Sequence, residues 1–283
     1  MAMDIAVTLP QLGHAAGPRA IRRAARQAEE LGFSHVWAND HITFPLGQSH
    51  PSPYMYDPLL TLATAAAVTD TIGIGGQITA AYYTPLWLAN ALASLDALAD
   101  GRLTVAIGVG WSQREFAALG SSFADRGRRT DEIIDILRAS WRNEAVSFAG
   151  EYYRFDPVKI LPQPAHPIPL WIAGETEPAY HRAVTRGDGY HGGSWVLPPD
   201  QIERAVGRIR AERPEPEFVV SLYTHDWDPA AHDPAGIVRE RDAYEAAGVQ
   251  CVVAAPSRRT ADDWLASVEA LASLLDLQPR SES

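Results

Sequence analysis

Short apolar runs alternate with longer amphipathic segments eight times along the chain. The apolar runs have the length of β-strands and lie at residues 4–8, 34–37, 72–78, 103–108, 170–173, 189–191, 217–223 and 250–254. The amphipathic segments repeat apolar residues at helical spacing and lie at residues 18–31, 57–69, 85–99, 127–143, 177–186, 199–210, 234–247 and 260–275. Proline or glycine marks several boundaries, as in Gly17-Pro18 and Leu31-Gly32 around the first helix.

Strands that alternate with helices pair in parallel, because each helix carries the chain back to the same edge of the sheet. Eight such units predict one (β/α)8 barrel domain of the α/β class over residues 1–283, with an open doubly wound sheet as the alternative. Two long segments interrupt the rhythm. Residues 41–56 follow the second strand, and residues 146–169 begin like a hairpin and end as an extended connector.

Composition narrows the class of protein. The chain is 46% hydrophobic and 21% charged with a net charge of −11, which argues against nucleic acid or an anionic membrane as the main partner. No apolar run approaches the length of a membrane span, and the first residues lack the pattern of a secretion signal. A single cysteine, Cys251, excludes an intramolecular disulfide. We therefore expect a cytoplasmic protein.

The fourth predicted strand ends in a pair of glycines, Gly108-Val109-Gly110. Glycines at a strand exit let the backbone approach a ligand closely, and free N–H groups there suit an anion. The third glycine of a dinucleotide-binding motif is absent, since Gln113 stands in its place. Alone, the motif fits a cofactor site or a simple tight turn.

Asp40 and His41 directly follow the second predicted strand, where a barrel places its catalytic residues. Histidine can exchange a proton near neutral pH, and a neighbouring carboxylate could fix its tautomer. The alternative is a turn at residues 39–40 with a surface histidine.

Other strand exits offer weaker candidates. His191 ends the sixth strand and faces the pocket or a loop, and Glu175-Thr176 open the fifth helix, either as an anion site or as a simple N-cap. Aromatic residues such as Phe44 and Trp111 also lie beyond strand ends, which suits a pocket for a flat conjugated ligand. No metal-ligand spacing and no Gly-x-Ser-x-Gly elbow is present, so we expect no metal and no serine nucleophile.

At this point a family resemblance is visible. Ala28-Glu-Glu-Leu-Gly-Phe-Ser-His-Val-Trp-Ala-Asn-Asp-His41 resembles the first helix and second strand of the bacterial luciferase-like flavin monooxygenases. Residues 71–103, Gly108-Val-Gly-Trp-Ser-Gln-Arg-Glu-Phe116, Pro169-Leu-Trp-Ile-Ala-Gly174 and Arg186-Gly-Asp-Gly-Tyr190 are similar to its following blocks. Together they cover residues 3 to 275, and the overall look is closest to the branch that uses coenzyme F420, a 5-deazaflavin.

The resemblance implies a luciferase-like barrel with F420, or alternatively FMN, at its carboxyl-terminal face. It places Asp40 and His41 beside the reactive ring, with His41 handling a proton and Asp40 orienting it. It assigns cofactor binding to Gly75, Gly76, Gln77, Gly108, Val109, Gly110, Ala173, Gly174, Glu175 and Thr176. It also implies a non-prolyl cis peptide within residues 75–78, and a homodimer. Phe44, Trp111 and His191 are then candidates for the substrate pocket.

One residue departs from the family pattern. The sugar-phosphate dehydrogenases of the family have a catalytic glutamate directly after the glycine turn, where this chain has Trp111, and Glu115 does not inherit that role. We therefore expect hydride transfer between F420 and an uncharged small organic substrate. The alternatives are an FMN-dependent monooxygenase that uses reduced flavin and O2, a non-catalytic cofactor-binding protein, and a metal-dependent barrel hydrolase.

Overall fold

A computed structural model describes residues 3–47, 52–194, 199–225, 227–256 and 259–279. Its core is a closed barrel of eight parallel strands in the order β1-β10-β9-β8-β7-β4-β3-β2. These strands are β1 (Asp4–Thr8), β2 (His35–Asn39), β3 (Gly73–Thr79), β4 (Leu103–Gly108), β7 (Leu170–Ala173), β8 (Gly189–Gly193), β9 (Val219–Thr224) and β10 (Cys251–Ala254). The predicted barrel is confirmed, and the open sheet is excluded.

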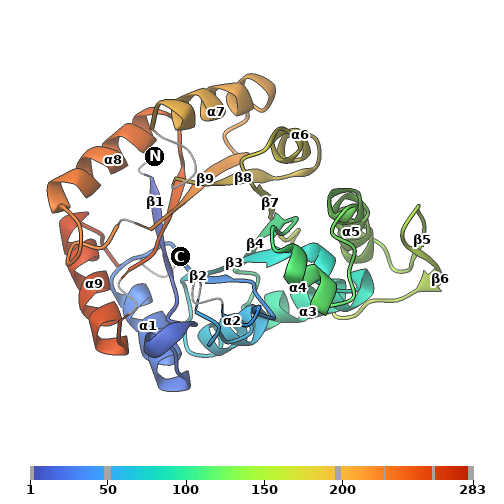
Figure 1. Ribbon diagram of the computed structural model, residues 1–283, viewed down its shortest axis with the longest axis horizontal. Helices are drawn as coiled ribbons and strands as arrows, with labels where there is room; N and C mark the ends of the chain where they lie inside the picture. The colour runs from blue at the N-terminus through green and yellow to red at the C-terminus, as the bar shows by residue number, and fades with distance from the viewer. Residues whose placement is uncertain (1–2, 48–51, 195–198, 226, 257–258, 280–283) are drawn as a thin grey trace.

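Helices surround the barrel, as the predicted periodicity requires (Figure 1). They are α1 (Pro18–Glu30), α2 (Pro58–Ala66), α3 (Pro85–Leu98), α5 (Arg126–Arg142), α6 (Glu177–Arg186), α7 (Pro199–Glu212), α8 (Pro234–Ala246) and α9 (Ala261–Leu274). Proline occupies the first turn of α1, α2 and α3, and the Asp57 side chain caps α2 by accepting from the Leu60 N–H. All eight predicted helices are therefore present, with ends shifted by a few residues.

The structure adds short elements that the periodicity did not predict. These are α4 (Gln113–Ala118) after β4, and the 3-10 turns η1 (Gly13–Ala15) and η2 (Ala80–Tyr82). The expected hairpin is present as β5 (Val146–Ala149) and β6 (Arg154–Val158), which lie beyond α5 at the edge of the molecule (Figure 1). Both α4 and η2 follow strands at the carboxyl-terminal face, so they shape the mouth of the barrel.

Large aromatic rings fill the barrel interior. Trp37 and Trp171 stack with their ring centroids 5.7 Å apart, and His191 lies 5.1 Å from Trp37. Glycines make room for these rings, because a Cβ on Gly75 would lie 2.1 Å from the Trp37 ring and one on Gly189 would lie 2.5 Å from the Trp171 ring. The interior is thus packed solid, and ligands must bind above it, at the mouth.

Candidate active site

Most of the predicted site residues lie at the carboxyl-terminal face of the barrel. Asp40 and His41 directly follow β2, residues 109–111 follow β4, and residues 174–176 follow β7. All eight strands run in parallel, so these exits surround one mouth.

A buried carboxylate holds the His41 imidazole. The Nδ1 atom of His41 lies 2.9 Å from Oε2 of Glu115, whose side chain is 1% exposed against 15% for His41. The Tyr82 hydroxyl donates to the same oxygen at 2.8 Å. Oε1 of Glu115 accepts the backbone N–H groups of Ile42 and Thr43 at 2.7 and 3.1 Å. Four donor groups therefore converge on a single carboxylate.

These contacts decide the protonation state of the cluster. Burial alone would raise the pKa of Glu115, but the hydrogen bonds from His41, the two backbone N–H groups and Tyr82 outweigh it and lower the pKa. Burial, reinforced by the contact with Glu115, raises the pKa of Tyr82. Because an ionised carboxylate only accepts, Nδ1 of His41 carries the hydrogen in its contact with Glu115.

Asp40 belongs to a different network, contrary to the expectation that it orients His41. Its carboxylate accepts from the Thr79 backbone N–H and from the Tyr83 hydroxyl, both at 2.9 Å. The physical reason is that Asp40 follows β2 beside the end of β3, which brings the Thr79 N–H and the Tyr83 hydroxyl within its reach. Burial raises the pKa of Asp40 to about 7, although the hydrogen bonds from Thr79 and Tyr83 oppose the shift.

Sequence reasoning missed the contact between Glu115 and His41. The two residues are 74 positions apart, and no periodicity within one segment reports such a contact. One local signal was present, because Ser112-Gln-Arg-Glu115 has the spacing of a helix capping box. Ser112 does cap α4 by accepting from the Glu115 N–H, while the Glu115 side chain turns to His41 instead of back to the cap.

The three segments expected to bind the cofactor meet at Gly108. A Cβ built on Gly108 would lie 3.6 Å from Nε2 of Gln77 and 3.9 Å from Cβ of Ala173, which are ordinary contact distances. Gly110 differs, since its φ is +78° and a Cβ there would lie 2.7 Å from the Phe116 ring and 2.8 Å from Cγ2 of Thr79. The turn itself thus requires Gly110, whereas nothing in the protein requires the missing side chain of Gly108. A cradle for a flat ligand is consistent with that difference.

The exit of β7 carries a second candidate anion site. Thr176 is the N-cap of α6, but its side chain makes no capping hydrogen bond. Glu175 points elsewhere, because its Oε1 accepts the Gly193 N–H at 2.7 Å, and burial raises its pKa. Gly174 has a φ of +130°, which glycine adopts readily. The backbone and hydroxyl of Thr176 are therefore the suitable groups here, and the Glu175 carboxylate is not.

A cleft of about 810 Å³ extends from this point between the start of α5 and the length of α6. It is lined by Val109 and Thr176 at its inner end and by four arginines against two aspartates, namely Arg126, Arg128, Arg182, Arg186, Asp125 and Asp131. Ion pairs to carboxylates fix three of the arginines: Arg182 to Asp131, Arg186 to Asp131 and Asp135, and Arg128 to Glu151. Arg126 is the fourth arginine, and its guanidinium donates to the backbone carbonyls of Gly110 and Phe123 instead of to a carboxylate.

The β3 glycines have packing roles. Gly75 faces the Trp37 ring, and a Cβ on Gly76 would lie 2.9 Å from Cδ1 of Leu62 on α2. Their contact with a cofactor stays a prediction. The expected cis peptide within residues 75–78 was wrong, because Leu161–Pro162 is the cis bond found among the described residues. Here β3 runs in unbroken register with β2 and β4.

His191 lies in the barrel interior, below the mouth. It is 2% exposed, its Nδ1 lies 3.1 Å from Oγ of Ser221, and burial lowers its pKa to about 3. Packing against Trp37 and Trp171 explains this neutral ring without a substrate. The role of His191 in a substrate pocket stays a prediction.

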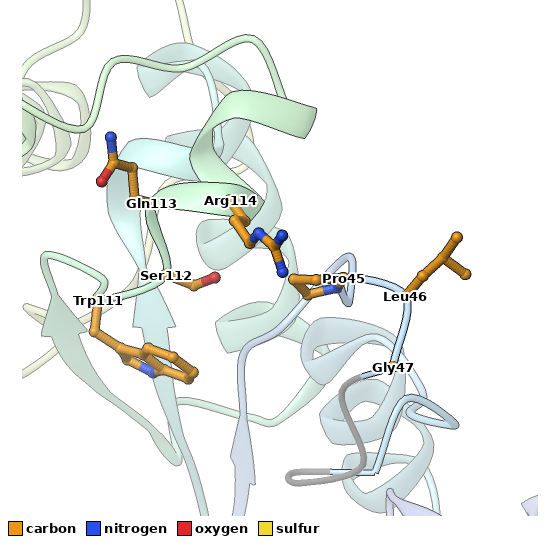
Figure 2. Close-up of a pocket in the computed structure, with 7 residues that line it drawn as sticks. All are labelled: Pro45, Leu46, Gly47, Trp111, Ser112, Gln113 and Arg114. Atoms are coloured by element: carbon orange, nitrogen blue, oxygen red, sulfur yellow. The ribbon is translucent and has the colours of Figure 1, made fainter.

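Phe44 and Trp111 flank His41, with ring centroids 5.5 and 5.6 Å from the imidazole. Trp111 also forms one wall of a cleft of about 430 Å³ together with Pro45, Leu46, Gly47, Ser112, Gln113 and Arg114 (Figure 2). Trp111 and Leu46 are both exposed, at 62% and 103%. Figure 2 shows the Arg114 side chain extending toward Pro45 across this cleft. An opening with both apolar and polar walls thus lies beside Trp111, which contacts the candidate acid–base residue.

The described residues contain no group of three or more His, Cys, Asp or Glu side chains placed to hold a metal ion. No helix within the described ranges is long and apolar enough to span a membrane.

Comparison with known proteins gives a consistent picture. The family described as luciferase-like monooxygenase matches residues 3–269. An F420-dependent glucose-6-phosphate dehydrogenase of Intrasporangium calvum is 31% identical over 230 residues, 76% of this chain and 68% of the relative. An F420-dependent hydroxymycolic acid dehydrogenase of Mycobacterium tuberculosis is 35% identical over 170 residues, 59% of this chain and 46% of the relative. The crystal structure of monooxygenase RslO1 from Streptomyces bottropensis superimposes with a TM-score of 0.82 at 21% identity, covering 96% of this chain and 98% of that one.

Proposed function

Because the chain belongs to the luciferase-like monooxygenase family, we propose that it is an F420-dependent oxidoreductase that transfers a hydride between the deazaflavin and an uncharged organic substrate. Family membership confirms the resemblance, and both dehydrogenase relatives described above are F420-dependent by name.

The observation that carries the choice of cofactor is the arginine-lined cleft beyond Val109 and Thr176. A flavin cradle at Gly108 would place the phosphate of either cofactor near the start of α6, where the Thr176 hydroxyl and the Glu177 N–H favour an anion. F420 carries further carboxylates beyond its phosphate, whereas FMN ends at its phosphate. A cleft that continues past Thr176 and is lined by arginine side chains, one of them without a carboxylate partner among the described residues, suits the longer anionic tail.

In this proposal different residues at the mouth bind the cofactor, exchange the proton and shield the reacting groups. Gln77, residues 108–110 and residues 173–176 hold the cofactor, and the cleft arginines hold its tail. When bound, the deazaflavin exchanges a hydride at one ring carbon, so no metal or protein nucleophile is needed. His41 exchanges the accompanying proton with the substrate. Phe44 and Trp111 flank the imidazole and limit the access of water to it.

The substrate class follows from the walls of the opening. Trp111 stands where the sugar-phosphate dehydrogenases have a glutamate, and Pro45 and Leu46 face it across the smaller cleft. The nearby carboxylates Glu115 and Asp40 are already occupied by internal donors. Arg114 is the one charged residue among those that line this cleft. We infer a partly apolar substrate with an uncharged reacting group.

Titration of the purified protein with F420 and with FMN, followed by absorbance and fluorescence, tests the cofactor. We expect micromolar or tighter binding of F420 and at least tenfold weaker binding of FMN. Turnover is then screened with F420 and panels of alcohols, enones and imines. Selective binding of FMN with consumption of O2 would replace the proposal by the monooxygenase alternative.

Replacing His41 by Ala separates an enzyme from a carrier. We expect the variant to bind F420 within about threefold of the wild type and to lose on the order of 100-fold in turnover, because general acid–base catalysis typically contributes 10²–10⁴-fold. Equal turnover in both proteins would remove His41 from the mechanism.

A further inference from the structure

Glu115 has no assigned role, yet it is the most heavily bonded side chain at the mouth of the barrel. It is nearly inaccessible, and both of its oxygens are used. The cost of burying a charged carboxylate is large unless donors compensate for it. A buried glutamate beside the candidate acid–base histidine therefore needs an explanation.

The two oxygens of Glu115 do different things. Oε1 accepts the backbone N–H groups of Ile42 and Thr43 and so fixes the chain directly after His41. Oε2 accepts from Nδ1 of His41 and from the Tyr82 hydroxyl. One oxygen thus places the backbone, and the other orients the ring.

The contact also determines which ring nitrogen is free. With Nδ1 donating to Glu115, a neutral imidazole has its lone pair on Nε2. Nε2 makes no hydrogen bond with the described residues and is not among their buried unpartnered atoms. The nitrogen without a partner among the described residues is therefore the basic one.

We propose that Glu115 is the positioning residue of His41, fixing the Nδ1–H tautomer so that Nε2 takes the proton of the substrate. As the substrate loses a hydride to the cofactor, its proton passes to Nε2, and the resulting imidazolium is paired with the Glu115 carboxylate. In the reverse direction, the same nitrogen returns the proton. This assignment rests on the proposed function, because it presupposes that His41 exchanges a proton with a substrate.

Replacing Glu115 by Gln changes one of the two carboxylate positions from a hydrogen-bond acceptor to a donor. The amide oxygen can still accept from Ile42 and Thr43, while the NH2 group then occupies the position of Oε2 and donates to Nδ1 of His41. Nδ1 must then accept, so the hydrogen moves to Nε2. The Tyr82 hydroxyl can rotate to accept from the other amide hydrogen.

Nitrogen NMR of the imidazole rings tests the tautomer directly, in protein without cofactor. The His41 signals are identified by their loss in the His41→Gln variant. We expect the Nδ1–H form in the wild type and the Nε2–H form in Glu115→Gln. In turnover with F420 we expect kcat to fall on the order of 100-fold with KM changed less than about threefold, because the base is lost but binding is not.

The matched control is Glu29→Gln. Oε1 of Glu29 accepts the N–H groups of Asp70, Thr71 and Ile72 just before β3, far from the mouth. This variant removes a similarly bonded carboxylate and should leave both the His41 tautomer and kcat unchanged.

Three results would overturn the positioning role. The first is an Nε2–H tautomer in the wild type, a result that does not depend on the folding of any variant. The second is an unchanged tautomer in Glu115→Gln. The third is unchanged turnover in Glu115→Gln although its tautomer has reversed. Failure of the proposed function looks different. In that case the wild type shows the Nδ1–H tautomer and its reversal in Glu115→Gln but no turnover with F420.

Discussion

Two glycines of one turn, Gly108 and Gly110, have different physical requirements. Gly110 has a left-handed backbone and no space for a side chain, so the fold requires glycine there. Gly108 has room for a methyl group at ordinary contact distances. In the sequence motif the two glycines look equivalent. The atoms around them show that the fold requires Gly110, whereas Gly108 is free to be a requirement of ligand binding.

This difference gives a paired test of the cofactor cradle. Gly108→Ala should keep the free energy of unfolding within about 0.5 kcal/mol of the wild type, because the new methyl meets no close atom. It should weaken F420 binding at least tenfold, because the methyl occupies the proposed cradle. Gly110→Ala should cost roughly 1–3 kcal/mol in stability through strain and overlap. Urea unfolding and F420 titration measure both effects, and unchanged F420 affinity in Gly108→Ala would place the cofactor elsewhere.

At the same scale, the neighbour in sequence was not the partner in space. Asp40 adjoins His41 along the chain, but the hydrogen bond to the ring comes from Glu115. The position of His41 could be predicted because a strand exit is a local pattern. Its partner could not, because α4 is only six residues long and reaches His41 only when β2, β3 and β4 lie side by side.

At the scale of elements, long periodic segments were predictable and short ones were not. Eight strands and eight helices follow from repeated apolar spacing, which tertiary packing reinforces over several turns. The turns η2 and α4 contain less than two helical turns each, so they have no period to detect. These two elements carry Tyr82 and Glu115, which explains why the site was less predictable than the fold.

Helix α5 presents arginines at both of its ends, and only one end lies on the proposed cofactor cleft. Arg128→Gln should weaken F420 binding about three- to tenfold and reduce the dependence of binding on salt, since one positive charge leaves the cleft. Arg142→Gln on the last turn of the same helix is the control, with the same change in net charge and no contact with the cleft. Titrations at two salt concentrations measure both variants. Equal losses in the two would indicate that only the overall charge matters.

At the scale of the whole molecule, two buried groups have opposite effects on how stability depends on pH. The pKa of Asp40 is raised from an ordinary 3.8 to about 7, so the folded state holds its proton more tightly than the unfolded state. Its contribution therefore lowers stability as pH rises through this window. The pKa of His191 falls from 6.5 to about 3, so its contribution lowers stability as pH falls. Between about pH 4 and 6.5 the two slopes offset each other.

The Asp40→Asn substitution removes the contribution of Asp40 to the pH dependence of stability. The stability of the variant relative to the wild type should rise between pH 4 and pH 7 by up to about 4 kcal/mol, from roughly three pKa units at 1.36 kcal/mol each. Urea unfolding at several pH values measures this difference. Asp156→Asn, at an exposed position on β6, is the matched control for the change from Asp to Asn. A constant difference between Asp40→Asn and the wild type would show that Asp40 titrates normally in the folded protein.

The position of Trp111 also allows ligand binding to be followed by intrinsic tryptophan fluorescence. An indole more than half exposed at the opening changes its emission when a guest covers it, and a guest there shields it from collisional quenchers such as acrylamide. Trp87, the other strongly exposed indole among the described residues, lies on α3 and can be silenced by Trp87→Phe. Candidate substrates can then be ranked by emission alone, without label, cofactor or turnover.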